Sequence, residues 1–318
     1  MSQNSAYTPA PASDFVLPFS LPKAGLRGQL VRLDAVSTRA LSAHALPETS
    51  QRVLAEALAL TAILGSALKL EGRLSLQTKG EGPLNLVATD YFGGGGLRGY
   101  ARLDETRANA ASDFAALVGE GALAITIEPK PGAQAYQGLV PLSEKGLAQS
   151  AETYFDQSEQ LPTMLKLAAG PIYRAETGNG WRAGGVMVQA LPGKAPGEIA
   201  ASDDWRRIRL FLDSLDDFEL LGSDTSAESV LWRLFHEDEV RVHQSEGLRF
   251  ECSCKPERIR AVLSAYPKAE LEDLPDPDGV IRTRCEFCGV TYEFPRSEEH
   301  TSELQSLAYL VCRLLLEK

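Results

Sequence analysis

Alternating hydrophobic and polar positions dominate the first half of the chain. This alternation is typical of strands with one buried face. It predicts a strand at 26–33 and three more at 73–78, 84–90 and 97–103. The turn-forming sequences KGEGP and YFGGGG separate these three strands from one another. A further hairpin is expected around PKPGAQ, with strands at 123–128 and 135–142. Two last strands are expected at 164–168 and 185–191. The short gaps between consecutive strands predict an antiparallel meander.

Two segments between these strands have helical patterns. In the longer one, apolar residues from Val53 to Leu70 occupy most faces of a helix, and Thr49 or Ser50 can cap its N-terminus. A helix that is apolar on most faces is buried. The second is expected over 144–157. The pattern therefore predicts an α+β core domain with an antiparallel sheet and packed helices over residues 14–192.

The flanks of this core differ from it in composition. Residues 1–13 are polar and rich in Pro and Ala, and we expect them to be disordered. Residues 193–247 form an acidic linker with 13 Asp and Glu against 6 Lys and Arg. The linker holds two amphipathic helices, whose apolar faces carry Trp205, Ile208, Leu212 and Leu215 in the first and Ala227, Val230, Leu231, Leu234 and Phe235 in the second.

The second linker helix begins with a capping-box pattern, Thr225-x-x-Glu228. Neither linker helix can bury its apolar face alone. Each must therefore lie on the core domain or on a partner.

Four cysteines mark a small module at residues 248–295. They form two tight pairs, Cys252-x-Cys254 and Cys285-x-x-Cys288. The first pair is expected on a strand at 250–254, where residues two apart point to the same side. A helix at 256–263 and a strand at 280–285 follow, and Gly289 can adopt a positive φ in the tight turn after the second pair.

Two cysteine pairs separated by about thirty residues can complete a tetrahedral thiolate site, which zinc favours. Most four-cysteine sites are purely structural, and spacing alone favours that interpretation. However, Cys-x-Cys is less usual in a simple zinc ribbon, and each pair is close enough to form its own disulfide. Zinc-bound thiolates are open to oxidation by peroxide or hypochlorite. In zinc-finger peptides the metal supplies about 10–16 kcal/mol of folding free energy. Oxidation should therefore unfold so small a module, and the sequence predicts a redox switch.

Composition narrows the other possibilities. The formal net charge is -11, and residues 248–295 hold 7 basic against 9 acidic side chains, which disfavours nucleic acid as a partner. No apolar run long enough for a membrane span and no secretory signal are apparent, so we expect a cytoplasmic protein. Gly94-x-Gly96-x-x-Gly99 precedes a strand pattern and is interpreted as a hairpin turn, not a nucleotide site. His236 and His243 lack a catalytic context, and no enzyme activity is predicted.

The final segment, 296–318, resembles a translated sequencing adapter and is interpreted as non-native. The similarity covers RSEEHTSELQS and LVCRLLLEK. We therefore leave His300 and Cys312 out of the candidate site.

Taken together, these motifs resemble the heat shock protein 33 family, the 33 kDa chaperonins. The resemblance is carried by the cysteine motifs and by four further stretches: EGPLNL at 81–86, YFDQSEQLPT at 154–163, AGGVMVQALP at 183–192 and VLWRLFHE at 230–237. It extends over about residues 24–295.

The resemblance implies a redox-regulated holdase that uses no ATP. The reduced form would bind one Zn²⁺ through Cys252, Cys254, Cys285 and Cys288 and be inactive. Oxidation under oxidative stress would form the disulfides Cys252–Cys254 and Cys285–Cys288, release zinc and unfold the module. The linker would then loosen, and a homodimer would bind unfolding client proteins through the core domain. Candidates for the cover that lifts are Trp205, Ile208, Leu231, Trp232, Leu234 and Phe235. The competing interpretations are a zinc-ribbon nucleic-acid binder and an enzyme with a structural zinc.

Overall fold

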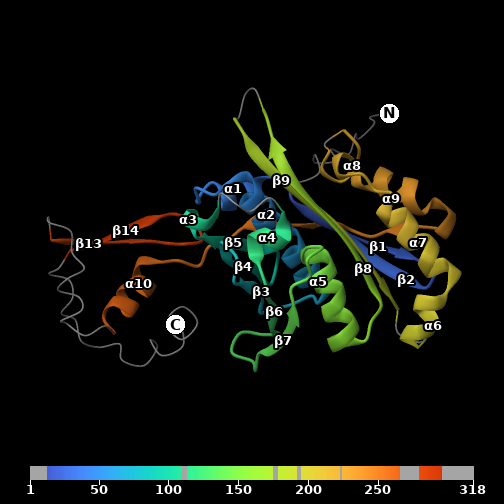
Figure 1. Ribbon diagram of the computed structural model, residues 1–318, viewed down its shortest axis with the longest axis horizontal. Coiled ribbons are helices and arrows are strands. Elements are labelled where there is room, and N and C mark those ends of the chain that lie inside the picture. Colours follow the sequence, from blue (N-terminus) through green and yellow to red (C-terminus); the bar gives the residue numbers. More distant parts are fainter. Residues whose placement is uncertain are drawn as a thin grey trace, which may run out of the picture. The chain divides into compact units, whose positions relative to one another are not determined.

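Most strands of the chain form two six-stranded sheets in the computed structural model (Figure 1). The structure describes residues 13–108, 113–174, 178–191, 195–222, 224–265 and 279–295. The chain divides into two compact units, Met1–Glu251 and Cys252–Lys318. Both sheets belong to the first unit, and nearly all their strand pairs are antiparallel. The predicted α+β class with an antiparallel-sheet core is therefore confirmed.

The first sheet has the strand order β10-β1-β2-β9-β8, and β11 also pairs with β1. Its strands are β1 (Phe15–Leu21), β2 (Leu26–Leu33), β8 (Thr163–Ile172), β9 (Gly180–Ala190), β10 (Arg241–Val242) and β11 (Glu246–Gly247). Strand β2 has the predicted bounds and lies between β1 and β9, with Leu30 opposite both Leu17 and Val186. Strands β8 and β9 are longer than predicted, because their pairing continues to Ile172 and Gly180.

Strand β1 was not predicted from the sequence, because Pro18 interrupts the apolar run. Proline has no N–H to donate and is found at positions where the ladder is open. On the outer side of β1, β10 pairs at residues 19–20 and β11 pairs at residues 15–16, so Pro18 falls between the two short partners. The carbonyl of Pro18 still accepts a hydrogen bond from the His243 N–H at 2.9 Å.

The second sheet has the order β12-β5-β4-β3-β6-β7. Its strands are β3 (Arg73–Gly80), β4 (Leu84–Phe92), β5 (Gly96–Leu103), β6 (Gly121–Glu128), β7 (Tyr136–Pro141) and β12 (Arg249–Phe250). The predicted meander and hairpin are confirmed, and only β12 joins its neighbour in parallel. Gly94 and Gly95 have φ values of 86° and 91° between β4 and β5, so the glycine motif is the predicted hairpin turn.

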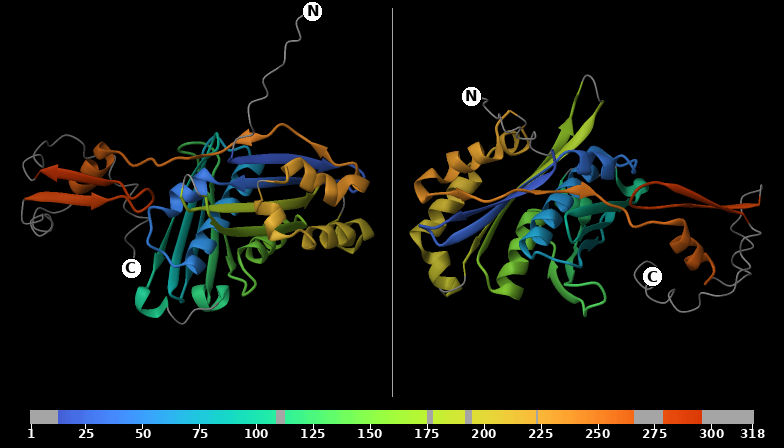
Figure 2. Two further views of the ribbon diagram at one scale, coloured as in Figure 1. Left: turned by 90° about the horizontal axis from the view of Figure 1, so that it is seen from above. Right: turned by 180° about the vertical axis from the view of Figure 1, so that it is seen from behind.

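The helix α2 (Glu48–Ala67) forms the centre of the first unit and packs against strands of both sheets (Figure 2). Fourteen of its residues are buried, as its apolar pattern predicts. It begins after Pro47 and not after the predicted caps, since neither Thr49 nor Ser50 caps it. Gly65 is needed for the close approach of the second sheet, because a Cβ atom there would lie 2.2 Å from the Tyr91 ring.

Shorter helices fill the rest of this unit. The helix predicted at 144–157 is α5 (Leu147–Tyr154), which continues as the π-helical turn η1 (Phe155–Glu159). Three helices of the core domain, residues 14–192, were not predicted, since they are too short to show a period: α1 (Ala35–Leu41), α3 (Glu105–Ala108) and α4 (Phe114–Val118).

The acidic linker folds as helices on the first sheet (Figure 1). Its elements are α6 (Pro196–Ala201), α7 (Asp203–Asp213), α8 (Asp217–Leu221), α9 (Ala227–Phe235) and the 3-10 turn η2 (His236–Asp238). The apolar faces of α7 and α9 join side chains of β1, β2, β8 and β9 in a second core, as predicted for helices that cannot be buried alone. The Thr225 capping box was wrong by one residue: Ser226 caps α9 and accepts from the Ser229 N–H.

The second unit holds a small hairpin and one helix within its described residues. Strand β13 (Val280–Arg284) pairs with β14 (Thr291–Pro295), and α10 (Pro256–Leu263) has the predicted bounds. The strand predicted at 250–254 was wrong, because β12 ends at Phe250 and residues 251–255 have no regular structure. The tail 296–318, with His300 and Cys312, lies outside the described residues, as do residues 1–12.

Within the described ranges, no helix combines the length and the apolarity that crossing a bilayer requires.

Asp14 provides a test of how the first unit is held together. Its carboxylate is buried and accepts hydrogen bonds from the N–H groups of Asp34, Ala35 and Val36 at 2.8–3.0 Å, at the start of α1. We predict that Asp14→Ala lowers the free energy of unfolding by about 3 kcal/mol, because three N–H groups, of which that of Val36 is buried, lose a charged acceptor. Urea denaturation measures this change.

A matched control is Asp113→Ala, which removes an exposed cap that accepts one N–H, from Ala116. It should cost about 1 kcal/mol. Equal losses in the two variants would contradict the assigned role of Asp14.

Candidate metal centre

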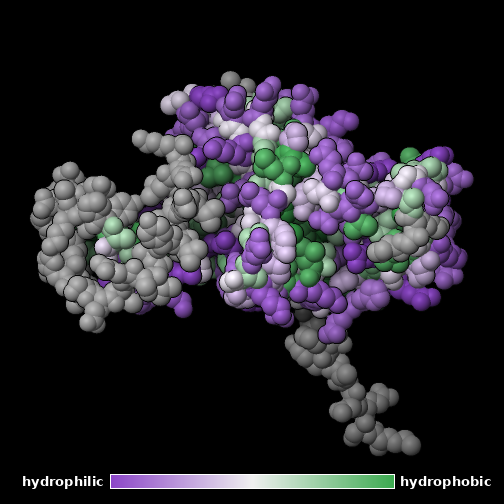
Figure 3. Space-filling view, turned by 90° about the horizontal axis from the view of Figure 1, so that it is seen from below, coloured by the Kyte–Doolittle hydropathy of each residue, from purple (hydrophilic) through white to green (hydrophobic). Residues whose placement is uncertain are grey.

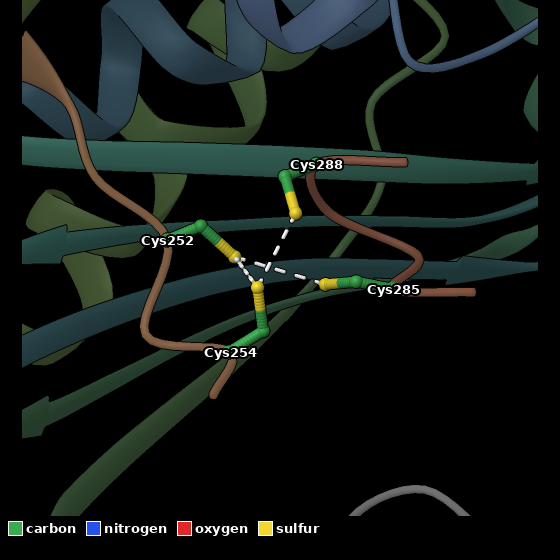
Figure 4. Close-up of side chains that lie close together, drawn as sticks. All are labelled: Cys252, Cys254, Cys285 and Cys288. Atoms are coloured by element: carbon green, nitrogen blue, oxygen red, sulfur yellow. Dashed lines mark hydrogen bonds between the residues drawn. The ribbon is translucent and has the colours of Figure 1, made fainter. Parts of the chain in front are cut away.

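The four predicted cysteines of the second unit come together (Figure 4). Their Sγ atoms lie within 4.8 Å of one another. The Cys252–Cys254 and Cys254–Cys288 sulfur distances are 3.3 Å, and the Cys252–Cys285 distance is 3.7 Å. All four are free thiols, and Cys288 is the most buried at 5% exposure. The side chains converge on one point from two separate segments of the chain.

The second pair is positioned by a closed turn at the end of β13. The N–H of Cys285 donates to the Val290 carbonyl at 2.9 Å, and the N–H of Gly289 donates back to the Cys285 carbonyl at 2.8 Å. Gly289 has a φ of 72°, the left-handed conformation predicted for it. The first pair lies in irregular backbone, so its sulfurs converge without the strand pleat that was expected to align them.

The donor set fits zinc. Four ligands at the usual Zn–S length of about 2.3 Å stand about 3.8 Å apart at the corners of a tetrahedron. The sulfur separations given above are near this value, and the fourth corner needs no histidine. Among the described residues, the group that could hold a metal consists of the four cysteines alone. The thiolates would hold the ion, and their number would close its coordination shell.

The thiols do not ionise equally. Burial raises the pKa values of Cys252 and Cys288. Burial also opposes ionisation of Cys254, but hydrogen bonds from Tyr292 and the neighbouring cysteines outweigh it and lower the pKa of Cys254 to about 7. Since the thiolate is the form that binds metal, Cys254 is the thiol best prepared to ionise near neutral pH.

One residue at the site was missed by sequence reasoning. The hydroxyl of Tyr292, on β14, lies 3.2 Å from the Cys254 sulfur and 3.4 Å from the Cys254 carbonyl oxygen. The interaction with Cys254 raises the pKa of the Tyr292 phenol. Alternation along the strand could have indicated it, because Tyr292 shares a face with the buried Phe294.

The histidines are engaged elsewhere. The His236 ring stacks on Trp232 with centroids 4.9 Å apart, and the His243 Nε2 atom lies 3.2 Å from the Ser20 hydroxyl. Both belong to the first unit.

The six candidate cover residues do not share one environment. Ile208, Leu231, Leu234 and Phe235 are buried in the core that the linker helices share with the first sheet, and Trp205 is partly buried against it. Trp232 is 64% exposed and lies on the outer face of α9. It therefore does not belong to the buried face of the cover.

Comparisons with known proteins identify the family of this chain. The family model described as Hsp33 protein matches residues 14–295. The 33 kDa chaperonin of Caulobacter vibrioides is 38% identical over 88% of this chain and 94% of that protein. The 33 kDa chaperonin of Pseudoalteromonas atlantica is 35% identical over 87% of this chain and 91% of its own length.

A solved structure shares the fold. The 33 kDa chaperonin of Thermotoga maritima superposes with a TM-score of 0.74 at 24% identity, over 90% of this chain and 96% of that one. The extent of the family match, together with relatives above 30% identity over most of the chain, establishes the family. The chain belongs to the Hsp33 family.

Proposed function

We propose that this protein is a redox-regulated holdase chaperone that uses no ATP and binds unfolding proteins only after oxidation. The main support for this proposal is that four free thiols come together in a chain whose relatives are named 33 kDa chaperonins. In the reduced form, Cys252, Cys254, Cys285 and Cys288 hold one Zn²⁺ per chain. The protein acts in the cytoplasm as a stress-response chaperone, forms a homodimer when oxidised and is not an enzyme.

Each disulfide forms from two thiolates and one molecule of hydrogen peroxide, with release of two hydroxide ions. A thiolate attacks an oxygen of hydrogen peroxide, which forms a sulfenic acid and releases hydroxide. A second thiolate displaces hydroxide from that sulfur and forms the disulfide. Each pair is separated by no more than two residues, and we assign the disulfides Cys252–Cys254 and Cys285–Cys288. The short contacts between the pairs allow other pairings, so sequence proximity and not distance supports this assignment.

The second unit depends on its metal because its own core is small. Among its described residues, the buried side chains besides Cys288 are the apolar Ile281 and Phe294. In zinc-finger peptides the bound metal contributes about 10–16 kcal/mol of folding free energy, more than so small a core can replace. Loss of the thiolates by oxidation therefore unfolds this unit.

In the first unit, the linker helices cover an apolar face of the first sheet. Phe235 of α9 stacks on Phe19 of β1 with ring centroids 5.8 Å apart, and both side chains are fully buried. On the face shown in Figure 3, hydrophilic residues predominate and hydrophobic ones gather in small patches. Removal of α7 and α9 would expose the sheet face beneath them, and this face would bind the apolar segments of unfolding clients.

Ion pairs and carbonyl contacts fasten the linker helices. Arg32 donates to the carbonyls of Glu219, Leu220 and Thr225 at 2.7–2.9 Å, which ties β2 to the end of α8 and the start of α9. Arg207 of α7 pairs with Asp238 of η2 through two contacts of 2.6 and 3.0 Å, and that carboxylate is 1% exposed. Because a lone carboxylate would be costly at such a buried position, α7 and η2 should detach together.

Residues 241–250, which lead from the end of the linker towards the cysteines, are held by very short pairings. Strands β10, β11 and β12 pair over two residues each, and Phe250 is two residues before Cys252. Each pairing is therefore weak alone. Unfolding that begins at the cysteines can proceed along this segment towards η2 and α9.

We predict that Cys285→Ser lowers zinc affinity by more than about 100-fold, since it removes a ligand and second-shell losses already reach that value. Metal analysis after dialysis against a zinc chelator measures the change. Ser253→Ala, which changes the residue between the two ligands of the first pair but removes no sulfur, should retain one zinc per chain. Full retention of zinc by Cys285→Ser would contradict the ligand assignment.

We also predict that peroxide-treated protein suppresses aggregation of a chemically unfolded client without nucleotide, and that reduced, zinc-loaded protein does not. Light scattering measures aggregation, and mass spectrometry after thiol alkylation identifies the disulfides. Equal suppression by both forms would favour a constitutive chaperone with a structural zinc.

The Arg207–Asp238 pair offers a test of the cover. Arg207→Ala should destabilise the docked linker by about 2 kcal/mol, less than for a fully buried pair because Arg207 is one-third exposed. Hydrogen exchange should become faster in α7 and α9, and the reduced protein should gain chaperone activity.

The neighbouring Arg206→Ala is the matched control, because the side chain of its partner Asp203 is 99% exposed. It should change neither hydrogen exchange nor chaperone activity. Faster exchange in Arg207→Ala without any gain of chaperone activity would show that the linker does not cover the client-binding face.

A further inference from the structure

The hydroxyl of Tyr292 occupies a defined position beside the cysteine cluster. It lies 3.2 Å from the Cys254 sulfur, which also contacts the sulfurs of Cys252 and Cys288. The phenol has no other role in the proposed switch, since it is neither a zinc ligand nor a redox partner. The phenol is therefore a further group in direct contact with a sulfur that the proposed switch oxidises.

The ring is held in place by the hairpin. Tyr292 pairs with Thr283 across β13 and β14, two residues along the ladder from the pair Ile281 and Phe294. Phe294 is buried, and the guanidinium of Arg260 on α10 lies over its ring, 5.6 Å from the ring centroid. Because the strand fixes the backbone on this face, the hydroxyl meets the sulfur with little further loss of conformational freedom.

We propose that Tyr292 is a positioning residue that restrains oxidation of Cys254 and so sets the peroxide sensitivity of the switch. This inference rests on the proposed function, because it concerns the same four sulfurs. The hydroxyl donates a hydrogen bond to a sulfur lone pair, which is the electron pair that attacks peroxide. Donation lowers the electron density on that sulfur and holds its side chain in one orientation.

The restrained step is the first one of oxidation. The Cys254 thiolate attacks one oxygen of hydrogen peroxide, the O–O bond breaks, and hydroxide leaves with the electron pair. The sulfenic acid at Cys254 then reacts with a second thiolate, which displaces a second hydroxide and forms the disulfide. In the zinc-loaded protein the sulfur is already a thiolate, so the hydrogen bond acts on its nucleophilicity.

The test is Tyr292→Phe in the full chain, loaded with zinc and fully reduced. Hydrogen peroxide should release zinc about five-fold faster than from the unsubstituted protein, since a hydrogen bond to a charged sulfur is strong and about half of its effect reaches the attack rate. A zinc-binding dye follows release, and timed alkylation with mass spectrometry follows Cys254 itself. Tyr136→Phe, which changes an exposed tyrosine on β7, should leave the rate unchanged.

Cobalt substitution separates this role from a structural one. With Co²⁺ in place of zinc, loss of the hydrogen bond should shift the sulfur-to-metal charge-transfer band to longer wavelength, while the metal content stays at one per chain. An unchanged band with an unchanged release rate would overturn the proposal. Reduced metal content or faster metal loss without peroxide would also overturn it, because Tyr292 would then only support the fold.

These readouts are independent of chaperone activity. If the oxidised protein fails to protect clients while Tyr292→Phe still speeds zinc release, the proposed function fails and the role of Tyr292 stands. If the oxidised protein protects clients and the substitution has no effect on release or spectrum, the role of Tyr292 fails alone.

Discussion

The convergence of four thiols on one point is the constraint on which the second unit depends. Four sulfurs within 4.8 Å cannot all be thiolates without a cation among them, because like charges at that separation repel strongly. As thiols, they would contribute little more than a few weak hydrogen bonds. In the proposed function, a bound metal stabilises this arrangement, and oxidation removes the thiolate charges that the metal needs. The stability of the second unit would then depend on its redox state.

The first unit has the opposite character. Its central helix α2 is buried between strands of both sheets, and its core contains no group whose charge depends on oxidation. Stability there comes from apolar burial and from buried caps such as Asp14. Such a unit can persist while a conditional one unfolds. The proposed switch needs a stable unit and a metal-dependent unit in one chain. If the whole fold unfolded, no folded surface would remain to bind a client protein.

The linker lies between these two extremes. The apolar side chains that face the sheet, such as Ile208 and Phe235, are buried as completely as those of the main core, yet they belong to short helices fastened by Arg32 and Arg207. Short helices are marginal alone and depend on tertiary packing. Charged contacts at buried positions are all-or-none, because a lone partner is costly. These features fit the proposal that the linker is either docked or released as a whole.

The sequence determined the fold class, the four-cysteine cluster and the existence of the longest helix, α2. Alternation of period two defined β2 to β7, and the spacing of the cysteines was sufficient to predict that the four come together. Elements with a weak or interrupted period were missed. Pro18 concealed β1, and α1 is too short to show a helical repeat. The strand expected at the first cysteine pair does not form, because β12 ends at Phe250.

Only the tertiary structure decided which residues act together. Trp232 and Leu231 are adjacent in sequence, yet one is exposed and the other buried, because only one face of α9 meets the sheet. Tyr292 acquires its place at Cys254 through the pairing of β13 with β14, which no local pattern specifies. Metal ligands can be read from residue type and spacing, since coordination demands them. The neighbours that tune a ligand come from the fold, because distance in space sets a hydrogen bond.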